Sequence, residues 1–230
     1  MVGVKTNPFR DWRTFLTEIA IIVVGVLIAL LAQQVADSRN WDAQVRDARE
    51  SMDGQLAGSM FAARERIGTA DCIERQLARL DRLTDLAEVP PLNPVTKWGL
   101  RPWSTSTWES ATASGAIAHM AKETRDTYSE IFDFTRKVGS LNTAEYDSAS
   151  GLSTMLTHRR LEPVSRDRLQ REIASARRYN KLLKLASQQW IEGAKSLHLR
   201  LADKDENDLR KSASAACPMP DDPPTQPAAG

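Results

Sequence analysis

Cysteine, histidine and aromatic residues are scarce in this chain of 230 residues, which has two cysteines, three histidines and 6% Phe, Trp and Tyr. Cys72 and Cys217 lie far apart, with no CxxC pair and no histidine at ligand spacing, so the sequence does not support a zinc site. His119, His158 and His198 are dispersed as well, and no HExxH pattern occurs. We therefore expect no metal centre.

The chain also lacks the motifs of nucleotide and hydrolytic chemistry. No Walker loop, no GxSxG and no dinucleotide-binding fingerprint occurs. We therefore expect that the protein is not an enzyme and holds no cofactor. Its 31 basic and 30 acidic residues give a net charge of +1, which argues against nucleic acid as a partner.

One stretch departs from the hydrophilic average, because residues 19–36 contain no charged side chain. An α-helix of this length rises about 27 Å, close to the roughly 30 Å hydrocarbon core of a bilayer. Trp12 and Trp41 flank the stretch, as aromatic residues do at the two interfaces of a membrane. The sequence predicts a membrane-spanning helix over residues 14–36, preceded by a cytoplasmic tail of residues 1–13.

A cleaved export signal is the main alternative for this stretch, because basic residues precede it. The leader, however, contains Asp11 and Glu18, and no convincing A-x-A site follows the apolar run. A pilin-type signal would need a glycine before its cleavage point, which is missing. We expect the helix to stay uncleaved.

Small and polar residues recur at three- and four-residue steps along the predicted span. Gly25 and Ala29 form a small-xxx-small pair, which lets two helix backbones approach closely in lipid. Ala32 continues the stripe, Glu18 begins it and Gln33 lies beside it. We expect helix pairing here with a second copy or with another membrane protein. The simpler alternative for Glu18 is that its carboxylate reaches the headgroups.

Basic residues lie on both sides of the span, and the amino terminus tips the balance slightly towards an inside N-terminus. We therefore expect an inner-membrane protein whose main domain, residues 37–211, is periplasmic. In an oxidising compartment Cys72 and Cys217 could form a disulfide, whereas in cytosol they would be two thiols.

After the span, apolar residues keep helical spacing, and no segment alternates long enough to build a sheet. The sequence predicts an all-α fold, with the first helix continuing into an antiparallel bundle of about four long helices. Ser106 and Glu109 fit a capping box for a short helix that stops at Gly115, and Ser165 can cap the last long helix. The Pro-rich tail, residues 212–230, is expected to be disordered.

Residues 89–106 form the one substantial predicted loop, because their prolines remove hydrogen-bond donors and restrict the preceding residues. Trp98 and Trp103 lie in this loop and Trp108 just beyond it. The tryptophans either anchor the loop on the bundle or form a recognition surface for a partner.

Basic residues are concentrated between Arg159 and Lys184, where nine of them face three acids. They fit a solvated outer face, anionic headgroups, an acidic partner or acids on a neighbouring helix.

Two patches resemble a known family. The first is Phe15-Leu16-x-Glu18 followed by Val24 to Leu30 and a later Trp, and the second is Thr107 to Ser110 leading to Ser114-Gly115-Ala116-Ile117. Together they resemble a family of uncharacterised bacterial single-pass membrane proteins catalogued as a domain of unknown function. Gln33-Gln34-Val35 departs from the Asn and Trp that relatives carry. The resemblance implies an anchored helical domain and no known activity.

These features predict a membrane-anchored helical scaffold or interaction protein of the bacterial envelope, which self-associates or serves as an accessory subunit of a membrane complex. The alternative is a periplasmic helical bundle that senses a ligand. Since the predicted tail 1–13 has no room for an output domain, such a sensor would act through a partner.

Overall fold

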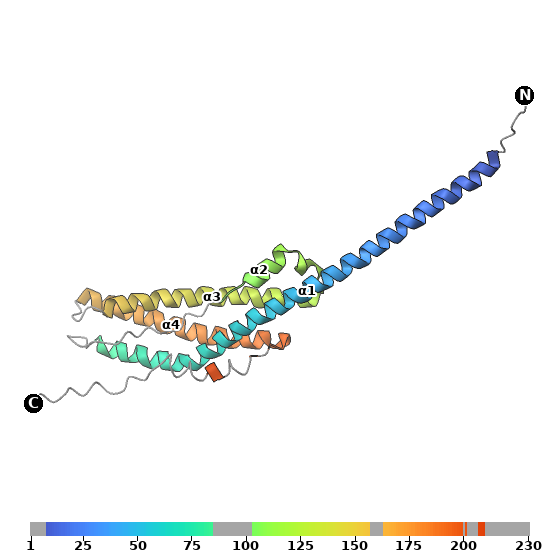
Figure 1. Ribbon diagram of the computed structural model, residues 1–230. Coiled ribbons are helices and arrows are strands. Elements are labelled where there is room, and N and C mark those ends of the chain that lie inside the picture. The colour runs from blue at the N-terminus through green and yellow to red at the C-terminus, as the bar shows by residue number, and fades with distance from the viewer. Residues whose placement is uncertain (1–7, 85–102, 157–162, 200, 202–206, 210–230) are drawn as a thin grey trace, which may run out of the picture. The chain divides into compact units, whose positions relative to one another are not determined.

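The computed structural model describes residues 8–84, 103–156, 163–199, 201 and 207–209, which form helices and turns and no strand. The predicted all-α class is therefore confirmed. The elements in chain order are α1 (Pro8–Leu83), α2 (Ser106–Ala113), the 3-10 helix η1 (Ala116–His119), α3 (Lys122–Leu156), α4 (Pro163–Gly193) and the 3-10 helix η2 (Ala194–Leu197) (Figure 1). The chain divides into two compact units, Met1–Asp47 and Ala48–Gly230.

In the first unit, the described residues belong to α1 alone. Every described side chain from Trp12 to Asn40 is exposed. The helix begins at Pro8, so the end of the predicted tail 1–13 is already helical. Proline is tolerated at this position, because the first N–H groups of a helix have no partner within the helix.

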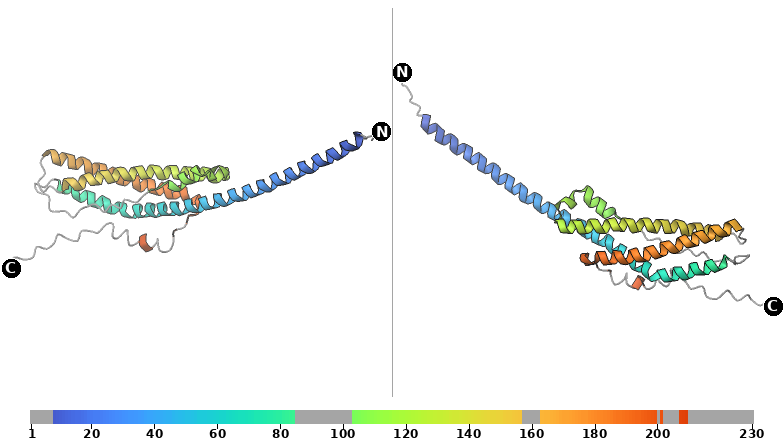
Figure 2. Two further views of the ribbon diagram at one scale, coloured as in Figure 1. Left: turned by 45° about the horizontal axis from the view of Figure 1, so that its top comes forward. Right: turned by 180° about the vertical axis from the view of Figure 1, so that it is seen from behind.

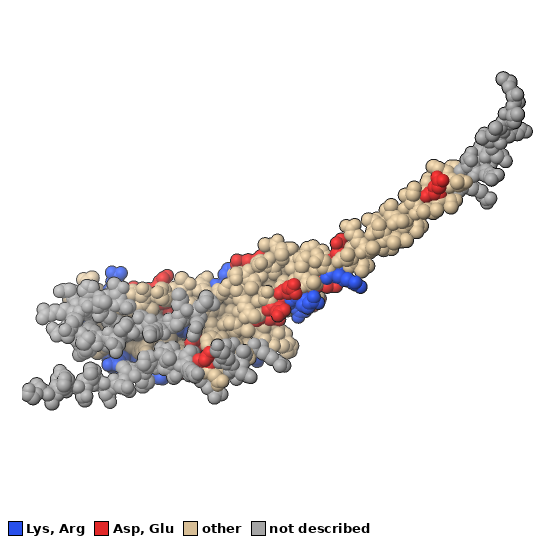
Figure 3. All heavy atoms as spheres, in the orientation of Figure 1, with Lys and Arg blue, Asp and Glu red and all other residues tan. Residues whose placement is uncertain are grey.

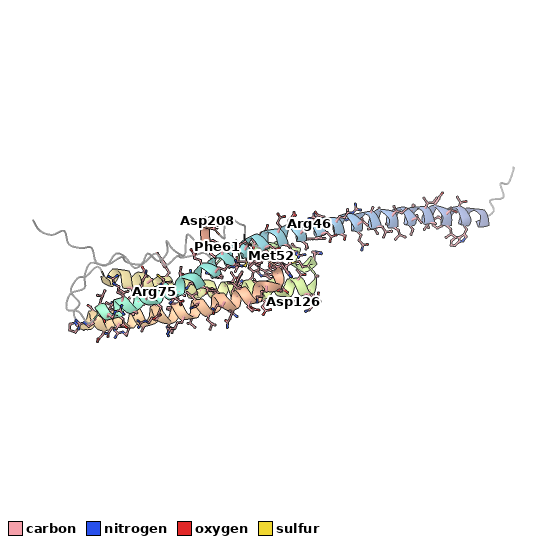
Figure 4. The ribbon with its side chains drawn as sticks, turned by 90° about the horizontal axis from the view of Figure 1, so that it is seen from below. Arg46, Met52, Phe61, Arg75, Asp126 and Asp208 are labelled. Carbon is pink, nitrogen blue, oxygen red and sulfur yellow. The ribbon has the colours of Figure 1, made fainter. Side chains whose placement is uncertain are left out.

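In the second unit, α1 from Ala48 onward, α3 and α4 enclose the apolar core. Figures 1 and 2 show α3 and α4 side by side along their length. One buried cluster joins the three helices through residues such as Leu77, Leu152 and Ile173. Met52, labelled in Figure 4, is the first fully buried hydrophobic side chain of α1.

Contacts between side chains define the directions of the three long helices. Asp53 and then Arg66 of α1 bond to Tyr128 and then Glu145 of α3, so α1 and α3 run in the same direction. Trp190 near the end of α4 bonds to Thr135 of α3, while Glu172 near the start of α4 bonds to Ser148. Helix α4 is therefore antiparallel to α3.

The described part of the bundle thus has three long helices, where about four were predicted. The remaining α-helix, α2, has only eight residues. Gly115 follows α2 in the left-handed region, with φ of 82°, a conformation that favours glycine. The chain turns at this point into η1 before α3 begins. This confirms the predicted stop at Gly115.

The predicted helix starts need correction. The N-cap of α2 is Thr105, whose hydroxyl donates to Glu109 at 2.7 Å, and the backbone N–H of Thr107 donates to Gln55 of α1 at 3.1 Å. The side chain of Gln55 on α1 therefore accepts a hydrogen bond from the first turn of α2, and this tertiary contact replaces the predicted Ser106 capping box. Helix α4 begins at Pro163, ahead of Ser165.

Candidate functional site

The first candidate site is the exposed apolar surface of α1 in the first unit. Its large apolar side chains from Trp12 to Val35 are 41–68% exposed. Its most apolar 18-residue window has a mean hydropathy of 2.7 and is 0% buried. In Figure 3 this part of the helix is an uncharged surface, interrupted by acidic atoms near its N-terminal end.

Among the described helices, α1 is the one that is long and apolar enough to cross a membrane, by length and composition. The core helix of a soluble domain has similar composition, but its apolar residues are buried, and those of α1 here are not. A signal sequence has the same composition as well, and the intact mass of the mature protein separates it from an uncleaved anchor.

All five residues predicted to support helix pairing, Glu18, Gly25, Ala29, Ala32 and Gln33, lie on this exposed part of α1. A Cβ atom added at Gly25 would meet nothing within 4 Å. The fold of this chain therefore does not require a glycine there, although glycine lowers helix stability by up to about 1 kcal/mol relative to alanine.

Two of the three predicted loop tryptophans contact the bundle. The Trp103 ring packs edge-on against Trp190 of α4, with centroids 6.0 Å apart, and the Trp108 ring stacks on Phe132 of α3 at 5.7 Å. A Cβ atom at Gly139 would lie 3.1 Å from the Trp103 Cβ, so α3 accepts this close approach because residue 139 is a glycine. These contacts favour the anchoring alternative for Trp103 and Trp108, while Trp98 lies outside the described residues.

A second candidate site is a buried polar cluster that joins the three long helices. The Arg66 guanidinium of α1 donates to both carboxylate oxygens of Glu145 on α3, at 2.8 and 2.5 Å. It also donates to the Asn180 side-chain oxygen on α4 at 2.7 Å, and Asn180 Nδ2 donates to the Ala70 carbonyl at 2.9 Å. The side chains of Arg66 and Glu145 are 11% and 4% exposed.

Burial governs the electrostatics of this cluster. It raises the pKa of the Glu145 carboxyl, against the opposing charge and hydrogen bonds of Arg66. It also lowers the pKa of the Arg66 guanidinium, although arginine keeps its charge at any ordinary pH. The cluster therefore holds two desolvated charges whose stability depends on their pairing.

Tyr128 forms another polar contact between α1 and α3. Its hydroxyl donates to the Asp53 carboxylate at 2.5 Å, and the residue is 1% exposed. Burial, together with this hydrogen bond, raises the pKa of Tyr128 to about 12. The hydrogen bond joins α3 to α1, with the phenol protonated at neutral pH.

Cys72 lies on α1, is 8% exposed and is disulfide-bonded. Its predicted partner, Cys217, lies outside the described residues.

The three histidines occupy dispersed positions in the sequence. His119 ends η1 and His198 follows η2, both exposed, and His158 lies outside the described residues. Within the described ranges, no group of three His, Cys, Asp or Glu side chains could hold a metal ion.

Some cations of the basic stretch of α4 pair with acids of α1. Arg177 pairs with Glu74 and Asp81 of α1, and Lys184 pairs with Asp71. The side chains of Arg171, Arg178 and Lys181 are instead exposed to solvent.

Comparison of the chain with models of protein families, with curated protein sequences and with solved structures found no match.

Proposed function

We propose that this protein is a single-pass, membrane-anchored helical scaffold or interaction protein of the bacterial envelope. The observation that carries the proposal is the exposed apolar surface of α1, which combines a mean hydropathy of 2.7 with 0% burial. Exposure of so much apolar surface to water is unfavourable, by about 25 cal/mol for each Å². A lipid bilayer removes this surface from water without any change in the helix.

The proposed position is the inner membrane, with the N-terminus inside and the helical domain in the periplasm. The disulfide of Cys72 supports this orientation, because disulfides persist in oxidising compartments and are rare in cytosol. The aromatic side chains at the start of α1 support an interfacial position, since the rings of Trp12 and Phe15 lie 6.4 Å apart on an exposed surface.

The proposed role of the span is to pair with a second copy of the chain or with another membrane protein. Gly25 supports this role, because no neighbour in the chain requires its small size. In lipid, a close approach of two helix backbones at small residues replaces the hydrophobic effect as the source of affinity. Glu18 and Gln33 on the same exposed helix add polar groups that a partner helix could bond.

Replacing Gly25 and Ala29 together with leucine should reduce the assembly. Two leucines would separate the helix backbones, and we expect a loss of about 1–2 kcal/mol of association free energy. Cross-linking in native membranes, followed by sizing in mild detergent, measures this loss.

The matched control replaces Val23 with leucine and Leu27 with isoleucine, which keeps the apolar character of the opposite face of α1. This control should leave the assembly unchanged. An assembly of the same size in the Gly25→Leu/Ala29→Leu variant would exclude pairing through these residues.

A further inference from the structure

One side of α1 in the second unit is buried although it is turned away from the core. We call it the α1 outer stripe, and it consists of residues at steps of three and four: Ala62, Glu65, Thr69 and Cys72. Their exposed fractions are 4–8%. Glu65 and Cys72 lie roughly 120–140° around the helix from the core residue Leu77. Cys72 also lies roughly 160° from Glu74, whose carboxylate pairs with α4. Another part of the chain must therefore cover this end of the stripe.

The disulfide of Cys72 points to the covering segment, because the chain has one other cysteine, Cys217. Ahead of Cys217, residues 207–209 form a short helical turn in which Asp208 and Leu209 are half-buried. Figures 1, 2 and 4 place this turn beside α1, and in Figure 4 the labelled Asp208 lies near the labelled Phe61. The chain therefore lies against α1 shortly before it reaches Cys217.

The length and direction of the chain fit a course along α1. Lys184 bonds to Asp71, and Arg177 bonds to Asp81, so α4 is antiparallel to α1 and the chain leaves η2 near the start of α1 in this unit. From Phe61 to Cys72 the helix rises about 17 Å. The residues from Leu209 to Cys217 span up to about 26 Å when extended, which is enough to follow it.

The composition of this segment suits the stripe. Arg210 and Lys211 are complementary in charge to Glu65, and a buried carboxylate is stabilised by an opposite charge. Residues 212–216 are serine and alanine, which lose little side-chain entropy when they become ordered. Residues 85–102 are the competing cover, but they contain no cysteine.

We propose that residues 207–217 form a strap along the α1 outer stripe, and that a disulfide between Cys72 and Cys217 locks the strap in place. As the S–S bond forms, the two thiols lose two protons and two electrons to a disulfide donor such as oxidised glutathione, which becomes two thiols. A dithiol reductant reverses the exchange, becomes a disulfide itself and releases the strap. In the cell, this redox lock rests on the proposed periplasmic position.

The test uses the full chain in detergent micelles, equilibrated in a glutathione buffer with the oxidised form in excess. This defined buffer makes the result independent of the compartment, so the strap can fail while the proposed periplasmic position stands. Peptide mapping of the unreduced parent chain identifies the disulfide. The photo-crosslinking residue p-benzoylphenylalanine then replaces Phe61 beside the stripe or, as a matched control, Tyr146 on α3, which is 50% exposed. A third sample adds Cys217→Ser to the Phe61 probe.

We expect a peptide pair joined through Cys72 and Cys217 of one chain, cross-links from position 61 to residues 207–217, and few from position 146 to that segment. Cys217→Ser should lower the cross-links about tenfold, because the strap loses the high effective concentration that the disulfide provides. Free thiols, a disulfide between two chains, cross-links from position 61 to residues 85–102 instead, equal cross-links from both positions, or undiminished cross-links without Cys217 would each overturn the inference. The disulfide map needs no variant, so it tests the pairing even if a probe variant fails to fold.

Discussion

Replacing Glu145 with leucine should lower the free energy of unfolding by about 3–5 kcal/mol, because the buried Arg66 guanidinium would lose its counter-charge. Arginine cannot give up its proton, so no accessible pH would relieve the loss. Urea unfolding of the full chain in detergent micelles, followed by tryptophan fluorescence, gives the measurement.

The reciprocal change, Arg66→Met, should be comparably destabilising at neutral pH and less so in acid. Without Arg66, the pKa of the buried Glu145 carboxyl is raised by burial with no opposing cation. A group whose folded pKa is raised stabilises the fold below its unfolded pKa, and that stability is lost as pH rises through the folded pKa. The difference between the Arg66→Met variant and the parent should therefore shrink as pH falls into the carboxyl range.

The double variant Arg66→Met/Glu145→Leu should lose far less than the sum of the two single variants. Apolar side chains of similar volume can replace a buried ion pair at little cost, although Asn180 Oδ1 would lose its donor at a cost of about 1–3 kcal/mol. Asp133→Leu is the control, because its exposed pair with Arg136 should contribute about 0–1 kcal/mol. Additive losses in the double variant would show that the two charges are not coupled.

Trp190→Ala should cost about 3–5 kcal/mol of stability, the range for truncation of a fully buried aromatic residue. The change removes an edge-on partner of Trp103 and the indole N–H that donates to Thr135 at 2.8 Å. Trp190→Phe should lose less, because it keeps a ring against Trp103. The same unfolding experiment measures both variants.

Trp12→Ala is the matched control for this prediction, since Trp12 is 60% exposed in the first unit. It should leave the unfolding of the bundle unchanged. A loss below about 1 kcal/mol for Trp190→Ala would contradict the anchoring of the segment at Trp103 through α4.

Periodicity alone predicted the helical class. Leu169, Ile173, Leu183 and Trp190 of α4 are among the apolar residues that recur at helical spacing, and each is buried. Side-chain spacing along one helix, however, contains no information on which helices are neighbours. The parallel course of α1 and α3 therefore appears only in the contacts between them.

The buried polar cluster was missed for a related reason. Asn180 offered a signal, because it occupies a position of the apolar α4 seam between Ala176 and Leu183. Arg66 and Glu145 offered little, since an isolated arginine or glutamate on a long helix is more often solvated. Their roles depend on a pair 79 residues apart in the chain, which no local pattern encodes.

The exposed apolar part of α1 and the loop tryptophans differ in how well the sequence alone predicts their roles. The exposed apolar helix follows from composition, because burial by other elements would have needed a matching apolar surface elsewhere. The role of the loop tryptophans was ambiguous in the sequence, because an aromatic residue is equally suited to a core and to an interface. Only the packing of Trp103 on Trp190 and of Trp108 on Phe132 favours one role over the other.

We infer that the N-terminal part of α1 is an uncleaved membrane anchor. The most direct test extracts membranes with carbonate and measures the intact mass of the protein that stays in them. We expect the protein in the membrane pellet, with an intact mass that still includes the residues ahead of Ala32. A protein that carbonate releases, or a mature chain that begins after Ala32, would contradict the account.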